Sequence, residues 1–330
     1  MFGGIDLLEC KFCFVEGTVN DGDFDLDQHN IGYWCNTCEG FNYINEDQEK
    51  HKFILIMEDK FKNKTTIYKP KVKFNKRLSV YRYPGGKSKL IEYLYSFIQK
   101  NKAKKLISPY SGGASFELAM LDAGIVETIH LNDLDTGVFS FWWLVKYMPF
   151  ALIHRLESTV PTHKQYFEAQ NLIKSDYAGA DLVEAAWASL LVNRLAYSGI
   201  YKANPLGGRN GNTKTLLSRW NADNLIERIK YIHSLSDKIT ITQENALALI
   251  EREYWEDGIL FIDPPYYKKG KDLYHCYYNE QDHIELSILL QNLHMCFPGS
   301  DIIMTYDYNK FINNLYEHPD KRIIGRNYSA

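Results

Sequence analysis

The sequence has no uninterrupted apolar run near the roughly 20 residues that a membrane-spanning helix needs. Its amino terminus, MFGGIDLLEC, lacks the charged segment followed by an apolar segment that marks a secretory signal. Only six of its 330 residues are cysteine, and four of these six form two CxxC pairs. That usage favours a reducing compartment over a disulfide framework. We therefore expect a cytoplasmic protein without a membrane span or a structural disulfide.

The chain also lacks a large excess of charge of either sign, because its formal net charge is -3. An anionic partner can therefore be inferred only from local patches, such as the lysine-rich stretch 60–77. With 45% hydrophobic and 24% charged residues, the chain can bury a large core and is not typical of disorder.

Short apolar runs alternate with longer amphipathic segments from Val80 onward. The runs 104–108, 126–131, 238–242, 258–263 and 301–306 predict strands, and the segments 88–100 and 115–122 predict helices. Strand signals are absent between about 148 and 236, where several helical patterns follow one another. The sequence thus predicts an α/β fold with a mostly parallel sheet and a helical insertion. We divide the chain into a small module at 1–50, a basic connector at 51–79 and a main domain at 80–330.

The small module contains the two CxxC pairs, Cys10 with Cys13 and Cys35 with Cys38. Four thiolates can close a tetrahedral zinc site, with each pair supplying two ligands from one tight turn. Four unrelated buried thiols are the alternative. Because so small a module has too little hydrophobic core to fold without a stabilising cross-link such as a metal ion, we favour a structural zinc ribbon.

A glycine-rich turn, Ser108 to Ser115, follows the predicted strand 104–108 and opens a helix. Glycines after a strand allow a ligand to approach the backbone at a helix amino terminus. A glycine turn without any ligand is as common, but the next strand ends at Asp133, about twenty positions on, where a carboxylate can bind ribose hydroxyls. The pair predicts a cofactor that carries adenosine. Neither this turn nor Pro84 to Ser88 has the full pattern of a phosphate loop.

The most specific pattern is Asp263-Pro264-Pro265-Tyr266 at the end of a predicted strand. Two prolines fix the backbone and remove amide donors, so the Asp263 carboxylate and the Pro264 carbonyl can both accept from one exocyclic amine. Tyr266 offers an aromatic face for a base. A rigid turn with a core tyrosine is the alternative interpretation.

Taken in this order, the motifs resemble the Dam-like (D12 class) family of DNA adenine-N6 methyltransferases over about residues 80 to 328. The resemblance implies a Rossmann-like methyltransferase sheet and S-adenosylmethionine as cofactor. Catalysis is expected from Asp263, Pro264 and Tyr266. The residues expected to bind the cofactor are Tyr83, Gly86, Lys87, Pro109, Tyr110, Ser111, Gly112, Gly113, Asp133, Asn245 and Asp263.

The same resemblance places the target-recognition region in the helical insertion, with double-stranded DNA as the partner. The expected DNA-binding residues are Arg194, Tyr197, Tyr201, Lys202, Arg209 and Lys214, although each charge by itself is equally typical of a solvated surface. A cognate restriction endonuclease is a further expected partner. Methylation of cytosine N4 or of RNA, and a nucleic-acid-binding relative without activity, remain alternatives. The recognition sequence and the oligomeric state are not determined by the sequence.

Overall fold

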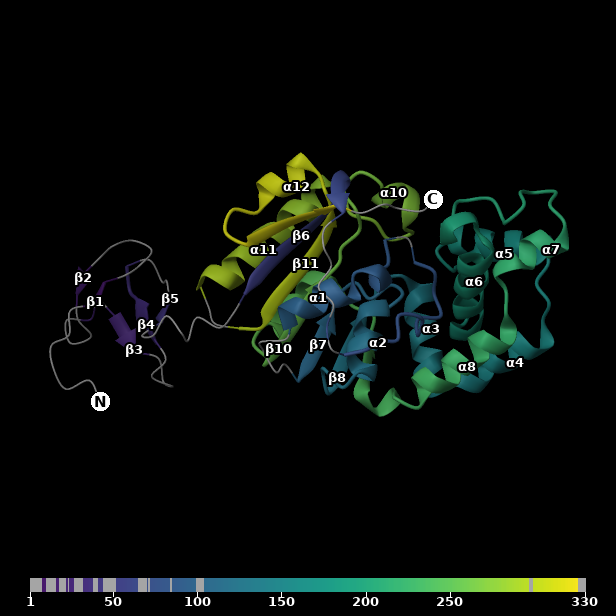
Figure 1. Cartoon of the computed structure of the whole chain (residues 1–330), viewed down its shortest axis with the longest axis horizontal. Helices are drawn as coiled ribbons and strands as arrows, with labels where there is room; N and C mark the ends of the chain where they lie inside the picture. Colours follow the sequence, from purple (N-terminus) through teal and green to yellow (C-terminus); the bar gives the residue numbers. More distant parts are fainter. Residues whose placement is uncertain are drawn as a thin grey trace.

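The computed structural model describes residues 8–9, 16–17, 22, 24–26, 32–37, 41–43, 52–64, 70, 72–83, 85–98, 104–296 and 299–325. Near the amino terminus, β1 (Leu8–Glu9) and β2 (Glu16–Gly17) form an antiparallel pair. Next, β3 (Phe24–Leu26), β4 (Gly32–Cys35) and β5 (Phe41–Tyr43) form a small antiparallel sheet. In the described residues, neither unit shares a hydrogen-bonded strand with the large sheet (Figure 1).

The large sheet has seven strands in the order β12-β6-β11-β10-β7-β8-β9, and every neighbouring pair is parallel. The strands are β6 (Phe53–Lys64), β7 (Lys105–Ser108), β8 (Thr128–Asn132), β9 (Ile239–Thr242), β10 (Gly258–Ile262), β11 (Asp301–Asp307) and β12 (Asp320–Gly325). The α/β fold and the five predicted strands are therefore confirmed. Strand order reverses between β7 and β10, which is where open parallel sheets bind ligands.

Strand β6 corrects the predicted domain division. It lies inside the sheet, between β11 and β12, and its first residues Phe53 to Met57 are all buried. Five apolar residues in succession suit a parallel strand that is covered on both faces. The lysines that begin at residue 60 obscured this short run in the sequence. The sheet therefore begins at residue 53, and 51–79 is not simply a basic connector.

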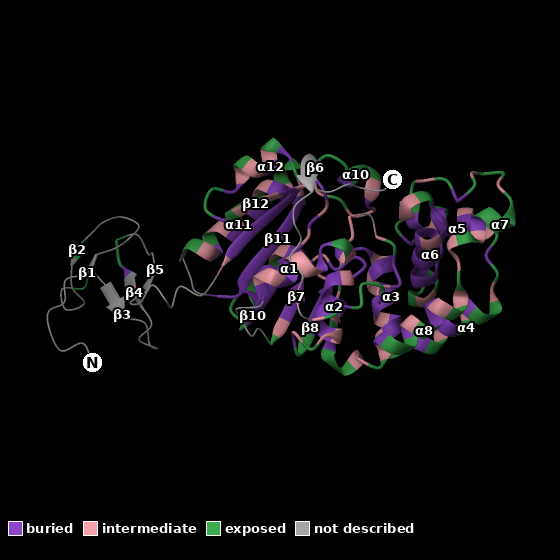
Figure 2. Cartoon of the chain, viewed as in Figure 1, coloured by how far each residue is buried: buried purple, intermediate pink, exposed green. Residues whose placement is uncertain are grey.

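Helices cover both faces of the sheet, and alternate strand residues enter two separate cores. Ile259 and Phe261 of β10 belong to one core, whereas Leu260 and Ile262 belong to the other. The first core is covered by α1 (Ile91–Ile98), α2 (Ser115–Asp122) and α3 (Thr136–Tyr147), and the second by α9 (Ala246–Glu253), α11 (Glu280–Cys296) and α12 (Lys310–Leu315). Figure 2 shows the strands between them as buried.

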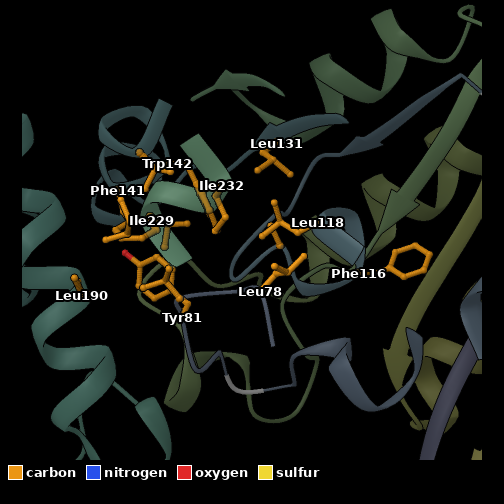
Figure 3. Close-up of a cluster of buried hydrophobic side chains, with 14 of the residues drawn as sticks. Leu78, Tyr81, Phe116, Leu118, Leu131, Phe141, Trp142, Leu190, Ile229 and Ile232 are labelled. Carbon is orange, nitrogen blue, oxygen red and sulfur yellow. The ribbon is translucent and has the colours of Figure 1, made fainter. Parts of the chain in front are cut away.

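The predicted helical insertion is confirmed. It contains α4 (Pro149–Ser158), α5 (His163–Lys174), α6 (Leu182–Leu195), α7 (Thr213–Leu216) and α8 (Ala222–His233). Capping boxes begin α5 and α6. Figure 3 shows Leu190, Ile229 and Ile232 of this region near Tyr81 and Trp142, so the insertion shares the first core. Helices α3 and α4 meet at a bend of 104°, and in the described part of the chain no single helix is long and apolar enough to cross a membrane.

Candidate active site

A cleft opens where β7, β8 and β10 end, and its empty space is about 980 Å³ including the open mouth. All eleven residues expected to bind the cofactor line this cleft. The sequence therefore predicted which residues converge here. The cleft also contains side chains that sequence reasoning missed, chiefly Glu117, Asp135, Tyr274, Cys276, Tyr277 and Tyr278.

The glycine loop after β7 is fastened to the end of β8. Gly112 has a φ of +46°, and its amide donates to Oδ2 of Asp133 at 2.8 Å. A Cβ atom on Gly112 would lie 3.0 Å from the ring of Tyr83, so the loop requires glycine at this position. Ser111 Oγ is buried and has no hydrogen-bond partner within the described chain. The loop thus offers an unpaired hydroxyl on a wall of the cleft.

Both carboxylate oxygens of Asp133 accept hydrogen bonds from backbone amides. Oδ1 accepts from the amide of Asp135 at 3.0 Å, and Oδ2 accepts from Gly112. Burial, followed by repulsion from Asp135, raises the pKa of Asp133 to about 7. Each oxygen retains a second lone pair, so the carboxylate can still accept from a pair of hydroxyl groups.

Glu117 of α2 is a buried acid on the same cleft, with 2% of its surface exposed. Its Oε1 accepts from Ser108 Oγ at 2.6 Å, and burial raises its pKa to about 7. The signal in the sequence is a carboxylate placed between Phe116 and Leu118, both of which are fully buried. Glu117 gives the cleft negative character that suits a cationic ligand.

Asp263 follows the last residue of β10 and accepts hydrogen bonds from two side chains. Lys87 Nζ lies 2.7 Å from Oδ1 and 2.6 Å from Oδ2, and Thr305 Oγ1 donates to Oδ1 at 2.7 Å. Burial raises the pKa of Asp263, while Lys87 and Thr305 act in the opposite direction. Lys87 lies in the short 3-10 helix η2 (Lys87–Lys89) and ends the sequence Arg82 to Lys87, which resembles the family's opening motif. This opening motif and the strand-end motif at Asp263 therefore meet at one ion pair.

Tyr266 and Pro264 do not line the cofactor cleft, although Asp263 and Pro265 do. Tyr266 is 5% exposed, and its hydroxyl lies 3.3 Å from Lys87 Nζ and donates to the Gly85 carbonyl at 3.4 Å. Gly85 has a φ of +78°, and a Cβ there would lie 2.5 Å from the Tyr266 hydroxyl. Gly85 therefore makes room for Tyr266.

Comparison with known proteins agrees with this geometry. The family model of the D12 class N6 adenine-specific DNA methyltransferases matches residues 83–328. The chain belongs to this family. It is 22% identical over 261 residues to the type II methyltransferase M.MjaIII of Methanocaldococcus jannaschii, and 23% identical over 255 residues to the type II methyltransferase M.CviBI of Paramecium bursaria Chlorella virus NC1A. Each match covers 72% of this chain and 86% of the relative.

Membership in the D12 class makes the protein a DNA methyltransferase, and S-adenosylmethionine is the cofactor of this family. The ligand-facing groups of the cleft fit that cofactor. Asp133 has acceptors to spare for ribose hydroxyls, the buried carboxylate of Glu117 suits an ammonium group, and Ser111 has an unpaired hydroxyl. Strand β6 lies outside the matched residues, although it is part of the same sheet.

The segment after Asp263-Pro264-Pro265-Tyr266 joins the cleft of this methyltransferase to its helical insertion. Tyr274 stacks on Tyr83 with centroids 5.7 Å apart, and Tyr278 Oη lies 2.6 Å from Tyr110 Oη. Between them, His275 Nε2 lies 2.9 Å from Asp176 Oδ1 in the insertion. The loop therefore lies between the helical insertion and the cleft, with side chains that contact both.

The six residues expected to bind DNA occupy different environments. Arg194 is used internally, because its guanidinium donates to the carbonyls of Arg219 at 2.7 Å and Val80 at 3.4 Å. Tyr201 packs against His275 with ring centroids 5.6 Å apart. The other four side chains are exposed: Tyr197, Lys202, Arg209 and Lys214. Lys202 also donates to the Lys271 carbonyl at 2.6 Å.

Arginines gather where the insertion meets the opening motif. The amide of Arg82 donates to Oδ1 of Asn193, the residue before Arg194, at 2.7 Å. Arg228 donates to the carbonyl of Ser79 at 3.0 Å, and Ser79 precedes Val80, whose carbonyl accepts from Arg194. Arg82 and Arg228 therefore lie near Arg194. Burial, followed by repulsion from other arginines, lowers the pKa of Arg194 to about 10 and also lowers the pKa of Arg82 and Arg228. Within the described residues, no carboxylate lies within 4.0 Å of Arg82, Arg194, Arg219 or Arg228. We call these four residues the arginine cluster.

The predicted zinc site falls mostly outside the described residues. Cys10, Cys13 and Cys38 are not described, whereas Cys35 is buried at the end of β4. No group of three or more metal-ligating side chains occurs in the described part of the chain. Zinc binding by the methyltransferase therefore remains a prediction.

Proposed function

We propose that this chain transfers a methyl group from S-adenosylmethionine to the N6 amine of an adenine flipped out of duplex DNA. The observation that carries this proposal is the position of Asp263. Its carboxylate lies on the wall of the cofactor cleft and is held by Lys87 and Thr305, while two prolines follow it directly. An acceptor fixed beside the cofactor suits an amine that must be aimed at the transferred methyl group.

The hydrogen-bond acceptors in the cleft suggest which part of S-adenosylmethionine each would bind. Asp133 would take the ribose hydroxyls, and Glu117 would face the ammonium group of the methionine part. Tyr83 and the glycine loop close the wall between them. When bound, S-adenosylmethionine supplies an electrophilic methyl group on a sulfonium, and the surrounding buried carboxylates favour such a cation.

Asp263 and the Pro264 carbonyl would accept hydrogen bonds from the amine and draw its lone pair out of conjugation with the ring. The nitrogen–methyl bond then forms as the sulfur–methyl bond breaks, and the surplus amine proton leaves to water or to Asp263. Flipping the base costs a few kcal/mol, offset by contacts in the pocket. Tyr266, in contact with Lys87 and Gly85, would form the wall for the base.

DNA binding is assigned to the arginine cluster and to the exposed side chains of the insertion. Guanidinium groups without a carboxylate partner favour phosphates; Arg82 is exposed, and the other three members of the cluster are half-buried. The exposed Lys202, Arg209 and Lys214 are the candidates for contacts beyond phosphates. Phosphate contacts position the duplex, and the insertion selects the target.

Two further assignments rest on the sequence and on the relatives. Both relatives are type II methyltransferases by name, which supports pairing with a cognate restriction endonuclease. The CxxC spacing supports a structural zinc ion held by Cys10, Cys13, Cys35 and Cys38, and the burial of Cys35 is compatible with it. Metal analysis of the purified protein, compared with Cys35→Ser, tests the second assignment.

The deciding experiment measures methyl transfer from labelled S-adenosylmethionine to unmethylated DNA and identifies the modified base by mass. Asp263→Asn should lower kcat by about a hundredfold or more, because a positioned acceptor is lost. Asp272→Asn removes an exposed carboxylate just after the tetrapeptide and should leave kcat unchanged. N4-methylcytosine, transfer to RNA alone, or no transfer despite cofactor binding would overturn the proposal.

A further inference from the structure

A second carboxylate stands beside the ion pair at the catalytic strand end. Glu58 of β6 has a fully buried side chain, and its Oε1 lies 3.9 Å from Lys87 Nζ. Lys87 is itself 3% exposed, so the ammonium lies between two carboxylates away from solvent. Glu58 comes from a strand that precedes the residues matched by the D12 family model.

The sheet fixes Glu58 in this position. In β6, Ile54 and Ile56 face the core under α1 and α2, while Leu55 and Met57 face the other core. By alternation, Glu58 shares the face of Ile54 and Ile56. Its carbonyl accepts from the amide of Tyr308 at 2.8 Å, which fastens the end of β6 beside β11.

The arrangement leaves Asp263 with limited accepting capacity. A carboxylate has about four lone-pair sites, and the two contacts with Lys87 and the one with Thr305 occupy most of them. If Lys87 had Asp263 as its sole counter-charge, the pair would be neutral and a weak acceptor for an amine. Glu58 brings a second carboxylate to the same ammonium, so the attraction of Lys87 is divided between Glu58 and Asp263, and Asp263 keeps its accepting character.

We propose that Glu58 is a positioning residue for methyl transfer: it shares the Lys87 ammonium with Asp263 and so leaves the Asp263 carboxylate able to bind the target amine. The inference rests on the proposed function, because it concerns the same reaction. Glu58 does not touch the amine and acts through Lys87.

The test compares Glu58→Gln with wild type in steady-state methylation of DNA across pH. The charge is lost with little change in shape, so kcat should fall roughly ten- to hundredfold, as is typical for outer groups that orient a reacting residue. KM for the cofactor should change less than about twofold. Glu58→Asp keeps the charge and should recover most of kcat. Asp59→Asn removes the next carboxylate of β6, on the opposite face, and should retain wild-type kcat.

The pH profile separates this role from a structural one. The charged groups that face Asp263 are Lys87, Glu58 and Glu117, and Asp307 faces both Glu58 and Lys87. Burial, the largest cause, and Glu58 both raise the pKa of Asp263. Replacement of Glu58 by glutamine should therefore move the acid limb of kcat to lower pH. An unchanged kcat and acid limb in Glu58→Gln, or a loss equal to that of Asp59→Asn, would overturn the inference. An inactive wild type would instead overturn the proposed function.

Discussion

The two sides of the site have opposite charge. The sheet side presents the buried carboxylates Glu117, Asp133, Asp135 and Asp263, and burial raises the pKa of each. The insertion side presents the arginine cluster, in which burial and then repulsion from nearby arginines lower the pKa values of Arg82, Arg194 and Arg228. On each side, burial disfavours the charged form of these groups, so a bound ligand of opposite charge would stabilise that form.

This difference matches the two ligands that a D12 class methyltransferase must hold. Desolvated carboxylates favour a cationic cofactor, and unpaired guanidinium groups favour a polyanion. Because the charges are separated on different elements, the two binding functions can be altered one at a time. The predictions below use substitutions that disturb both sides, or one side alone.

Removal of β6 should have the largest effect and should disrupt both sides together. A chain that lacks residues 1–64 loses the strand between β11 and β12, which would expose both sheet edges and the apolar run Phe53 to Met57. We expect no cooperative thermal transition by circular dichroism. A chain that lacks only residues 1–50 keeps β6 and should unfold near the wild-type temperature; an equal loss of structure in both would contradict the placement of β6.

Asp133→Asn should disturb the sheet side alone. Losing the charge of a buried acceptor for two hydroxyls should weaken binding of S-adenosylhomocysteine by about ten- to a hundredfold, since charged hydrogen bonds contribute about 1.5–3 kcal/mol. Isothermal titration calorimetry measures this change. Affinity for DNA should stay within about twofold of wild type. A parallel loss of DNA affinity would show that the two sides are not independent.

The same residue gives cofactor binding a pH dependence. Burial raises the pKa of Asp133 from 3.8 to about 7, and the ionised form is the one that accepts from hydroxyls. Binding of S-adenosylhomocysteine should therefore be full above pH 8 and decline as pH falls through 7. Glu117 acts in the same direction, because its pKa is also about 7. In Asp133→Asn the decline should be shallower, and in Asp133→Asn with Glu117→Gln it should disappear.

Arg82→Gln and Arg219→Gln should disturb the insertion side alone and have the smallest effect. Each change should weaken binding to all DNA sequences alike and lower the slope of log affinity against log salt by about one. Fluorescence anisotropy over a salt series measures both quantities. Lys164→Gln, an exposed lysine of α5 paired with Glu168, is the control. A slope that remains at the wild-type value would remove these arginines from the DNA interface.

The two sides also differ in how many of their residues could be predicted from the sequence. On the cofactor side, the expected residues line one cleft, because turns after strands leave short motifs such as Ser111-Gly112-Gly113 and Asp263-Pro264-Pro265-Tyr266. Glu117 was missed because a single acid inside a helix leaves no motif. Arg194 was expected to bind DNA, but its grouping with Arg82, Arg219 and Arg228 was missed because these residues are distant in the chain.

The sequence determined the α/β class, five strands, the helical insertion and, through the family resemblance, eleven of the residues that line the cleft. Periodicity and strand-end motifs are local properties, and the carboxyl ends of parallel strands converge once the sheet forms. Tertiary structure alone decided that β6 enters the sheet and that Glu58 meets Lys87. A run of five apolar residues indicates a buried strand, but only pairing with β11 and β12 decides where that strand lies in the sheet.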